Sequence, residues 1–164
     1  MVSQHSLLTT EEEQVRELIE IQANAIRNKD AEAAISIFDR KDVVLFEIAP
    51  PLQYEGPAAV TKNELIDWFA SFSGPIDYEV QNLRIHTDNG LAICHSLNHL
   101  KGQRTDGSFT DIWVRSTTCF RKANGTWKIV HEHTSVPFYM DGSLKAAVDL
   151  RPIQKTTQVR FERK

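Results

Sequence analysis

Four long strand-like segments, separated by three short turns that contain glycine, occupy residues 78–138. The segments read YEVQNLRIHT, LAICHSLNHLKG, TDIWVRSTTCFRK and TWKIVHEHTSVPF, and the turns contain DNG, DGSF and ANG. Such short turns can join only antiparallel neighbours, because parallel strands need a long crossover connection. The sequence therefore predicts an antiparallel meander in the C-terminal half of the fold.

The N-terminal part of the chain predicts three helices. Thr10 begins TEEE, a capping box, and apolar residues then recur at helical spacing to about Asn28. Asp30 is expected to cap a second, shorter helix with the sequence AEAAISIF. Thr61 begins TKNE, a second capping box, and the helix that follows it ends before Gly74.

A short strand is expected at residues 43–48, VVLFEI, and the prolines that follow end it. Helices followed by an antiparallel sheet, in a chain of 164 residues, favour one α+β domain with the helices on one face of a strongly curved sheet. We assign residues 1–152 to this domain and residues 153–164 to a basic C-terminal tail.

Composition restricts the possible partners. A net charge of -3 gives no reason to expect nucleic-acid binding. The sequence has no basic stretch followed by an apolar run at its start and no span of about 18 apolar residues, so a cytoplasmic protein without membrane contact is expected. Cys94 and Cys119 are expected to be buried free thiols. The predicted partners are a small apolar molecule and a second copy of the chain.

The order of elements, together with DIWVRSTTCFRK, NGTWKIVHEHTSVPF and the later DLRP, resembles the SnoaL-like, ketosteroid-isomerase-like families of the nuclear transport factor 2 superfamily. The resemblance covers about residues 11–152 and extends to the association domain of calcium/calmodulin-dependent kinase II. It implies a cone-shaped half-barrel, a cavity between sheet and helices, and usually a homodimer through the outer sheet face. Because the superfamily includes isomerases, dehydratases, cyclases, hydrolases and non-catalytic members, it does not fix an activity.

Side chains alternate across a strand, so the last two strands each offer one face to this cavity. We predict that the tryptophan-bearing faces line it, because they combine large rings with polar groups. These faces carry Asp111, Trp113, Arg115, Thr117, Trp127, Ile129, His131, His133 and Ser135. The outer, dimer-forming face is expected to carry Ile112, Val114, Thr118, Phe120 and Val130. A β-bulge would reverse part of this assignment.

Glu47 is the strongest single candidate for catalysis. The segment DVVLFE resembles the ketosteroid-isomerase segment whose sixth residue is the proton-transferring aspartate. A carboxylate between Phe46 and Ile48 that faces an apolar cavity should have a raised pKa and act as a general base near neutral pH. The alternative is an ion pair between Glu47 and Arg115, which would lower the pKa of Glu47. The sequence leaves both open.

The resemblance does not supply the ketosteroid-isomerase oxyanion hole. Its tyrosine position falls on Gln22, and its acid position falls near Thr117 or Ser116. Arg115, helped by Thr117, could instead hold a carboxylate or enolate oxygen, because a guanidinium group donates two charged hydrogen bonds. The alternative is a structural arginine that bridges strands.

His131 and His133 could bind a metal ion with Glu47 or His99, but no third ligand at diagnostic spacing follows them. We therefore predict no metal and no cofactor. A neutral imidazole of His131 or His133 that is hydrogen-bonded to Asp111, Glu47 or a serine, as proton donor or ligand contact, is the favoured interpretation.

Tyr54, Trp68 and Phe72 are predicted to line an apolar pocket, although aromatic residues on such a helix are more often core. The sequence thus favours a small-molecule-binding protein that moves a proton on a small apolar carbonyl compound, as an isomerase, dehydratase or cyclase. The predicted catalytic residues are Glu47, Arg115, His131 and His133. The alternative is a non-catalytic ligand-binding or dimerisation domain.

Overall fold

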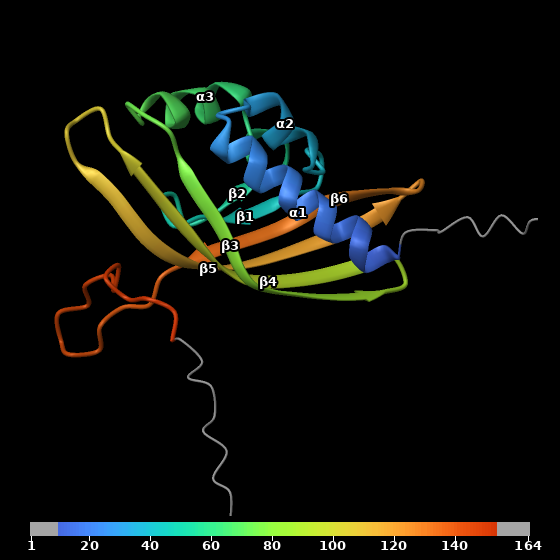
Figure 1. Ribbon diagram of the computed structural model, residues 1–164. Helices are drawn as coiled ribbons and strands as arrows, with labels where there is room; N and C mark the ends of the chain where they lie inside the picture. Colours follow the sequence, from blue (N-terminus) through green and yellow to red (C-terminus); the bar gives the residue numbers. More distant parts are fainter. Residues whose placement is uncertain (1–9, 154–164) are drawn as a thin grey trace, which may run out of the picture.

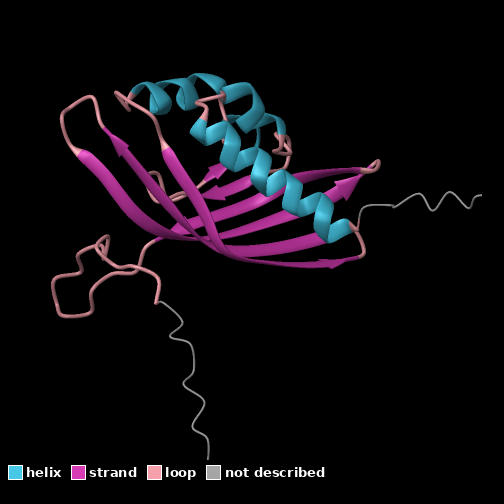
Figure 2. Ribbon diagram, viewed as in Figure 1, coloured by secondary structure: helices cyan, strands magenta, loops and turns pink. Residues whose placement is uncertain are grey.

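Helices cover one face of a strongly curved sheet in the computed structural model, which describes residues 10–153 (Figures 1 and 2). The helices are α1 (Glu11–Arg27), α2 (Ala31–Ser36) and α3 (Lys62–Ala70), with a 3-10 turn at Gly56–Ala58. The strands are β1 (Val44–Phe46), β2 (Tyr54–Glu55), β3 (Asp77–Asp88), β4 (Leu91–Gln103), β5 (Phe109–Ala123) and β6 (Thr126–Ser135). The predicted α+β class is confirmed.

The helices begin where their capping residues predict. Both halves of the capping box at Thr10 are formed, and the Asp30 carboxylate accepts from the backbone N–H of Ala33. The second helix ends at Ser36, earlier than expected, because Ile37 and Phe38 leave it to pair with β6. The carbonyl oxygen of Ile37 accepts from the N–H of Ile129 at 2.8 Å.

The sheet has the order β2-β1-β6-β5-β4-β3, and β3 to β6 form the predicted antiparallel meander. Strand β1 is parallel to β6, with Leu45 opposite Glu132. Among residues 10–153 no helix is long and apolar enough to cross a membrane. The predicted basic tail falls on residues 154–164, outside the described residues, apart from its first residue.

The buried residues show which face of β5 is concave and lies beneath the helices. Phe120 and Ile129 are opposite each other, are almost fully buried and pack with Val15 and Ile19 of α1. Alternation from Phe120 then places a second set of residues on the same concave face. This set is Ile112, Val114, Ser116 and Thr118, of which the last three are buried.

The predicted facing of β5 is therefore wrong. The residues assigned to the cavity lie on the convex, outer face, and the residues assigned to the outer face lie beneath the helices. The misplaced cavity residues are Asp111, Trp113, Arg115 and Thr117. The reason is that the small apolar and hydroxyl side chains fit under the helices, whereas the large Trp113 ring stacks on the outer face against His99.

A β-bulge reverses the second half of β6. Phe120 and Cys119 are consecutive on β5 but pair with Ile129 and His131, so Val130 is the extra residue. Trp127 and Ile129 face the core as predicted, whereas beyond the bulge Glu132 and Thr134 take the concave side. The prediction that His131, His133 and Ser135 line the cavity is wrong for this reason.

Candidate functional site

Glu132 lies on the concave face of the sheet beneath α1. The side-chain amide of Gln22 donates to its carboxylate at 2.9 Å, and the Thr118 hydroxyl also hydrogen-bonds to it. Burial raises the pKa of Glu132 above its ordinary value, while these two hydrogen bonds act in the opposite direction. The carboxyl group is therefore held by neutral donors in a desolvated position.

Glu47 follows β1 on the same side of the sheet. Leu45 is opposite Glu132 in the parallel pair, so Glu47, two residues further on, is also directed to the concave face. The Glu47 residue is exposed overall, but protein atoms surround its carboxyl group and shield it from solvent. Burial, and then the negative charge of Glu132, raises the pKa of Glu47 to about 7.

A chain of hydrogen-bonded polar side chains on β3 and β4 ends at Tyr78, which lies close enough to the two carboxyl groups to interact with their charges. Ser96 donates to the Asn98 amide oxygen at 2.7 Å, and the Asn98 amide nitrogen donates to the Tyr78 hydroxyl oxygen at 2.8 Å. Burial and the charges of Glu132 and Glu47 raise the pKa of Tyr78, so its phenol keeps a proton. Because Asn98 donates to Tyr78, this bond leaves the phenol hydrogen free to donate. We call Glu47, Glu132, Tyr78, Gln22 and Asn98 the acid cluster.

No lysine or arginine among residues 10–153 forms an ion pair with Glu47 or Glu132. The nearby Arg27 donates to the Tyr78 carbonyl oxygen at 2.7 Å and pairs with Glu20. The alternative ion pair between Glu47 and Arg115 is absent, because Arg115 lies on the opposite face of the sheet. Two acids without a cation can lower their repulsion by keeping one proton between them.

Asp111 and Trp113 lie together on the outer face, away from the acid cluster. The Trp113 ring stacks on His99 with centroids 4.3 Å apart and planes at 9°. His99 Nε2 lies 2.7 Å from the Asp111 carboxylate, and Arg151 lies 3.4 Å from the same carboxylate. His99, rather than His131 or His133, is thus the histidine that Asp111 contacts.

His131 and His133 flank the Phe46 ring on the outer face. Their ring centroids lie 4.9 and 5.6 Å from that of Phe46, both edge to face. His131 Nδ1 donates to the carbonyl oxygen of Val44 at 2.8 Å. Within the described part of the chain, no group of three or more His, Cys, Asp or Glu side chains could hold a metal ion.

The predicted aromatic lining belongs to the core around the acid cluster. Trp68 and Phe72 pack in the cluster of apolar side chains that Tyr78 also borders, whereas the Tyr54 hydroxyl donates to the Pro50 carbonyl oxygen. Phe72 is 2% exposed. Trp68 and Phe72 thus form an apolar wall next to Tyr78, and Phe72 offers almost no surface to a ligand.

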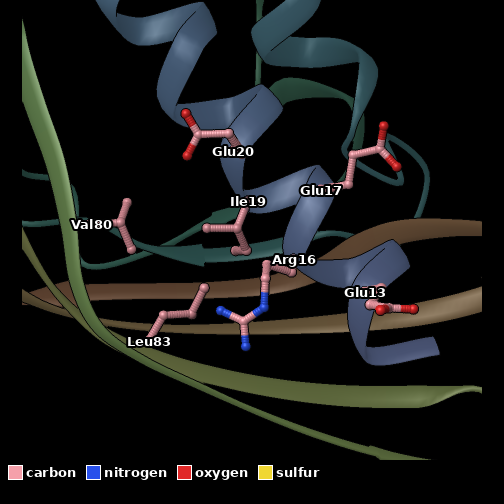
Figure 3. A pocket seen from close by; sticks show the side chains of 7 residues that line it. All are labelled: Glu13, Arg16, Glu17, Ile19, Glu20, Val80 and Leu83. Atoms are coloured by element: carbon pink, nitrogen blue, oxygen red, sulfur yellow. The ribbon is translucent and has the colours of Figure 1, made fainter. Parts of the chain in front are cut away.

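The structure also has two open grooves. One, of about 530 Å³, lies between α1 and β3, where Ile19 faces Val80 and Leu83 and glutamates form the rim (Figure 3). The other, of about 380 Å³, lies at the β3 bulge and includes Ser96. Neither groove is lined by a residue of the predicted site, but Ser96 connects the second groove to the acid cluster.

Sequence reasoning missed most of the acid cluster. Glu132 was not among the predicted site residues, and Gln22 was considered only because it occupies the position of the ketosteroid-isomerase tyrosine. One signal was present in the sequence. Ile129 and Val130 are adjacent apolar residues that break the alternation of the last strand, as expected where a bulge inserts a residue.

Residues 15–139 match the model of a family described as the SnoaL-like domain. An NTF2-like protein of unknown function from Pseudomonas putida is 31% identical, with 86% of this chain and 96% of that chain covered and a TM-score of 0.75. No curated protein matches this sequence.

Two more distant structures share the fold. A nuclear transport factor 2 superfamily protein from Salmonella enterica is 19% identical over 82% of this chain and 96% of that chain, with a TM-score of 0.69. A hexachlorocyclohexane dehydrochlorinase from Novosphingobium barchaimii is 14% identical over 74% of this chain and 82% of that chain, with a TM-score of 0.62.

Proposed function

The chain belongs to the SnoaL-like domain family, and on that premise we propose that it binds a small, mostly apolar carbonyl compound on the concave side of the sheet and moves a proton on it. The observation that carries the proposal is that the charges of Glu47 and Glu132 interact on the concave side, beside Tyr78, and that neither carboxylate pairs with a lysine or arginine among residues 10–153. A homodimer and a cytoplasmic location are part of the same proposal.

The two carboxyl groups take different roles in this mechanism. Glu47, at the open side of the cluster and with a pKa of about 7, removes a proton from the carbon next to the carbonyl group. The electron pair moves into the carbonyl oxygen, which becomes an enolate. The Tyr78 phenol, which keeps its proton, donates a hydrogen bond to that oxygen, while the charge of Glu132 helps to keep Glu47 basic.

The fate of the enolate decides the reaction. If Glu47 returns the proton to a different carbon, the compound is isomerised. If a leaving group departs from the neighbouring carbon, the compound is dehydrated, and the proton leaves with the group as water. An apolar wall with Trp68 would favour a ligand with few polar groups.

The test uses 5-nitrobenzisoxazole, a small apolar carbon acid that needs only a base. Removal of its ring proton breaks the nitrogen–oxygen bond and yields a coloured phenolate. We expect the full-length protein to open the ring with a rate that rises as the pH passes through about 7. Glu47→Gln should lower kcat/KM by about a hundredfold or more, because the base is lost.

Glu55→Gln is the matched control, since Glu55 lies on the adjacent strand with an exposed side chain whose carboxylate accepts from Gln53. It should leave the rate unchanged. Equal rates for the wild-type protein and Glu47→Gln would end the general-base proposal. Binding of the probe without turnover that depends on Glu47 would favour the alternative, a non-catalytic ligand-binding domain.

A further inference from the structure

Residues 136–153 follow β6 and fold into a compact loop, which we call the C-terminal arm. The N–H of Ala147 donates to the carbonyl oxygen of Pro137 at 2.8 Å, and the N–H of Tyr139 donates to the carbonyl oxygen of Lys145 at 2.9 Å. The Tyr139 hydroxyl donates to Asp149 at 2.6 Å. Most of the arm lies beyond residue 139, where the family match ends.

The arm exposes an unusual number of large apolar side chains. These are Phe138 (61% exposed), Met140 (87%), Leu144 (64%), Val148 (44%), Leu150 (46%) and Ile153 (93%). A group of apolar side chains in water is costly, and such groups commonly mark protein contacts. In Figure 1 the arm lies on the convex side of the sheet, away from the helices.

Within residues 10–153, no helix covers the outer sheet face on the same side (Figure 1). It exposes Ile93 (52%) and Phe46 (37%) and leaves Trp113 half-buried. Arg84 and Arg115 are exposed on this face, and neither forms an ion pair with any residue in the range 10–153. Besides Asp111, which is paired with His99 and Arg151, the face therefore presents apolar side chains and these two arginines.

The tip of the arm carries an anion, Asp141, and a cation, Lys145. Asp141 lies at the tip, where its carboxylate accepts from the N–H of Ser143 at 2.9 Å, and these hydrogen bonds lower its pKa. It is therefore an anion across the neutral range. At the base of the arm, Arg151 lies 3.4 Å from the Asp111 carboxylate of β5 on the convex side.

We propose that the C-terminal arm of one subunit packs against the outer sheet face of a second copy, with Asp141 next to Arg115 or Arg84 of the partner. A two-fold axis makes this contact reciprocal, so both arms and both faces are covered at once. The inference rests on the proposed homodimer, and it assigns to the arm half of the interface.

Light scattering and sedimentation of the full chain at micromolar concentration test the inference. The wild-type protein should be a dimer. Met140→Ser combined with Leu144→Ser should raise the dimer Kd by about tenfold or more, because exposed apolar contacts are lost. Both side chains are exposed in the subunit, so these changes should leave its fold intact.

Charge reversal gives a sharper test. Arg115→Glu and Asp141→Arg should each weaken the dimer about tenfold, and the double variant should recover most of the loss if these side chains face each other. If Arg115→Glu and Asp141→Arg do not compensate each other, the same pair of variants is made with Arg84→Glu in place of Arg115→Glu. Leu52→Ser is the control, since Leu52 is 93% exposed on the β1–β2 loop and should not affect dimerisation.

The outcomes separate the two proposals. A wild-type dimer that none of the arm variants weakens would overturn the role of the arm and leave the homodimer intact. A wild-type monomer would overturn both. Neither result bears on the turnover that depends on Glu47, which is measured with a different probe.

Discussion

Glu132 accepts hydrogen bonds from the neutral groups of Gln22 and Thr118, and it lies close enough to Glu47 for their charges to interact. Both carboxyl groups therefore bind a proton more tightly in the folded protein than in the unfolded chain. Protons stabilise whichever state binds them more tightly. The folded protein should thus lose stability as these protons dissociate.

The first prediction is a dependence of stability on pH. The contribution of Glu47 is fully present below its ordinary pKa of 4.5 and is lost as the pH rises through about 7. We expect this cluster to lower the Tm between these pH values, as measured by thermal unfolding in a series of buffers. Glu132→Gln should flatten this part of the profile, because the buried group no longer ionises.

The same variant should lower the pKa of Glu47, because the charge of Glu132 is the second cause of its increase. The pKa should stay above its ordinary value, since burial is the first cause. NMR titration of the Glu47 carboxyl carbon measures this directly. The result contradicts the interpretation if Glu132→Gln leaves the titration of Glu47 where it is in the wild-type protein.

The sequence predicted single residues with uneven success. Glu47 could be found, because a short apolar strand and two prolines specify its position and a desolvated environment. The charged partner of Glu47 could not be chosen from the sequence, since Arg115 and Glu132 are both distant from Glu47 along the chain. Which of the two residues approaches Glu47 depends on the face of the sheet to which each side chain is directed, and strand pairing in the folded sheet decides that face.

At the level of elements, Gly102 of β4 provides space for the third helix. An added Cβ at Gly102 would lie 2.6 Å from the Phe72 ring, which is held in the core beside Trp68. The strand can therefore pass beneath this ring only because it has no side chain there. The contact joins the end of α3 to the sheet near Tyr78.

The second prediction follows from this contact. Gly102→Ala should destabilise the protein by about 1–3 kcal/mol, because the ring of Phe72 must move out of a packed position. Chemical denaturation measures the loss. Gly74→Ala is the control, since no atom lies within 4 Å of its added Cβ. Similar stabilities for the two variants would show that Phe72 adapts without cost.

Capping residues and turns predicted the elements well, because they act locally. Thr10, Asp30 and Thr61 each cap a helix, and the turns at Gly90 and Gly125 join antiparallel strands. The facing of β5 was not predicted, because Trp113 and Val114 are both apolar and their alternation alone does not decide which is inside. Packing of Phe120 against α1 decides it.

At the scale of the whole molecule, all three described helices lie on the concave side, and the convex side of the part from residue 10 to residue 153 carries the C-terminal arm alone (Figures 1 and 2). A third prediction follows if the arm is covered by a second subunit. The amide hydrogens of Tyr139 and Ala147 should exchange with solvent more slowly as the protein concentration increases.

Hydrogen exchange at several concentrations, followed by mass spectrometry or NMR, measures this effect. The amide of Ala34, which bonds to Asp30 on the helical side, is an internal reference and should not change. Concentration-independent exchange of the arm, in a sample that contains dimers, would place the arm outside the interface.

The extra residue at Val130 gives the last strand two independent halves. The first half of β6 packs Trp127 and Ile129 into the core. In the second half, the bulge decides whether Glu132 or the histidines on either side of it face the interior. Insertion or deletion of a single codon at this point, with every other amino acid unchanged, would exchange Glu132 for its histidine neighbours. Among related chains, the length of this strand is therefore as informative about chemistry as its composition.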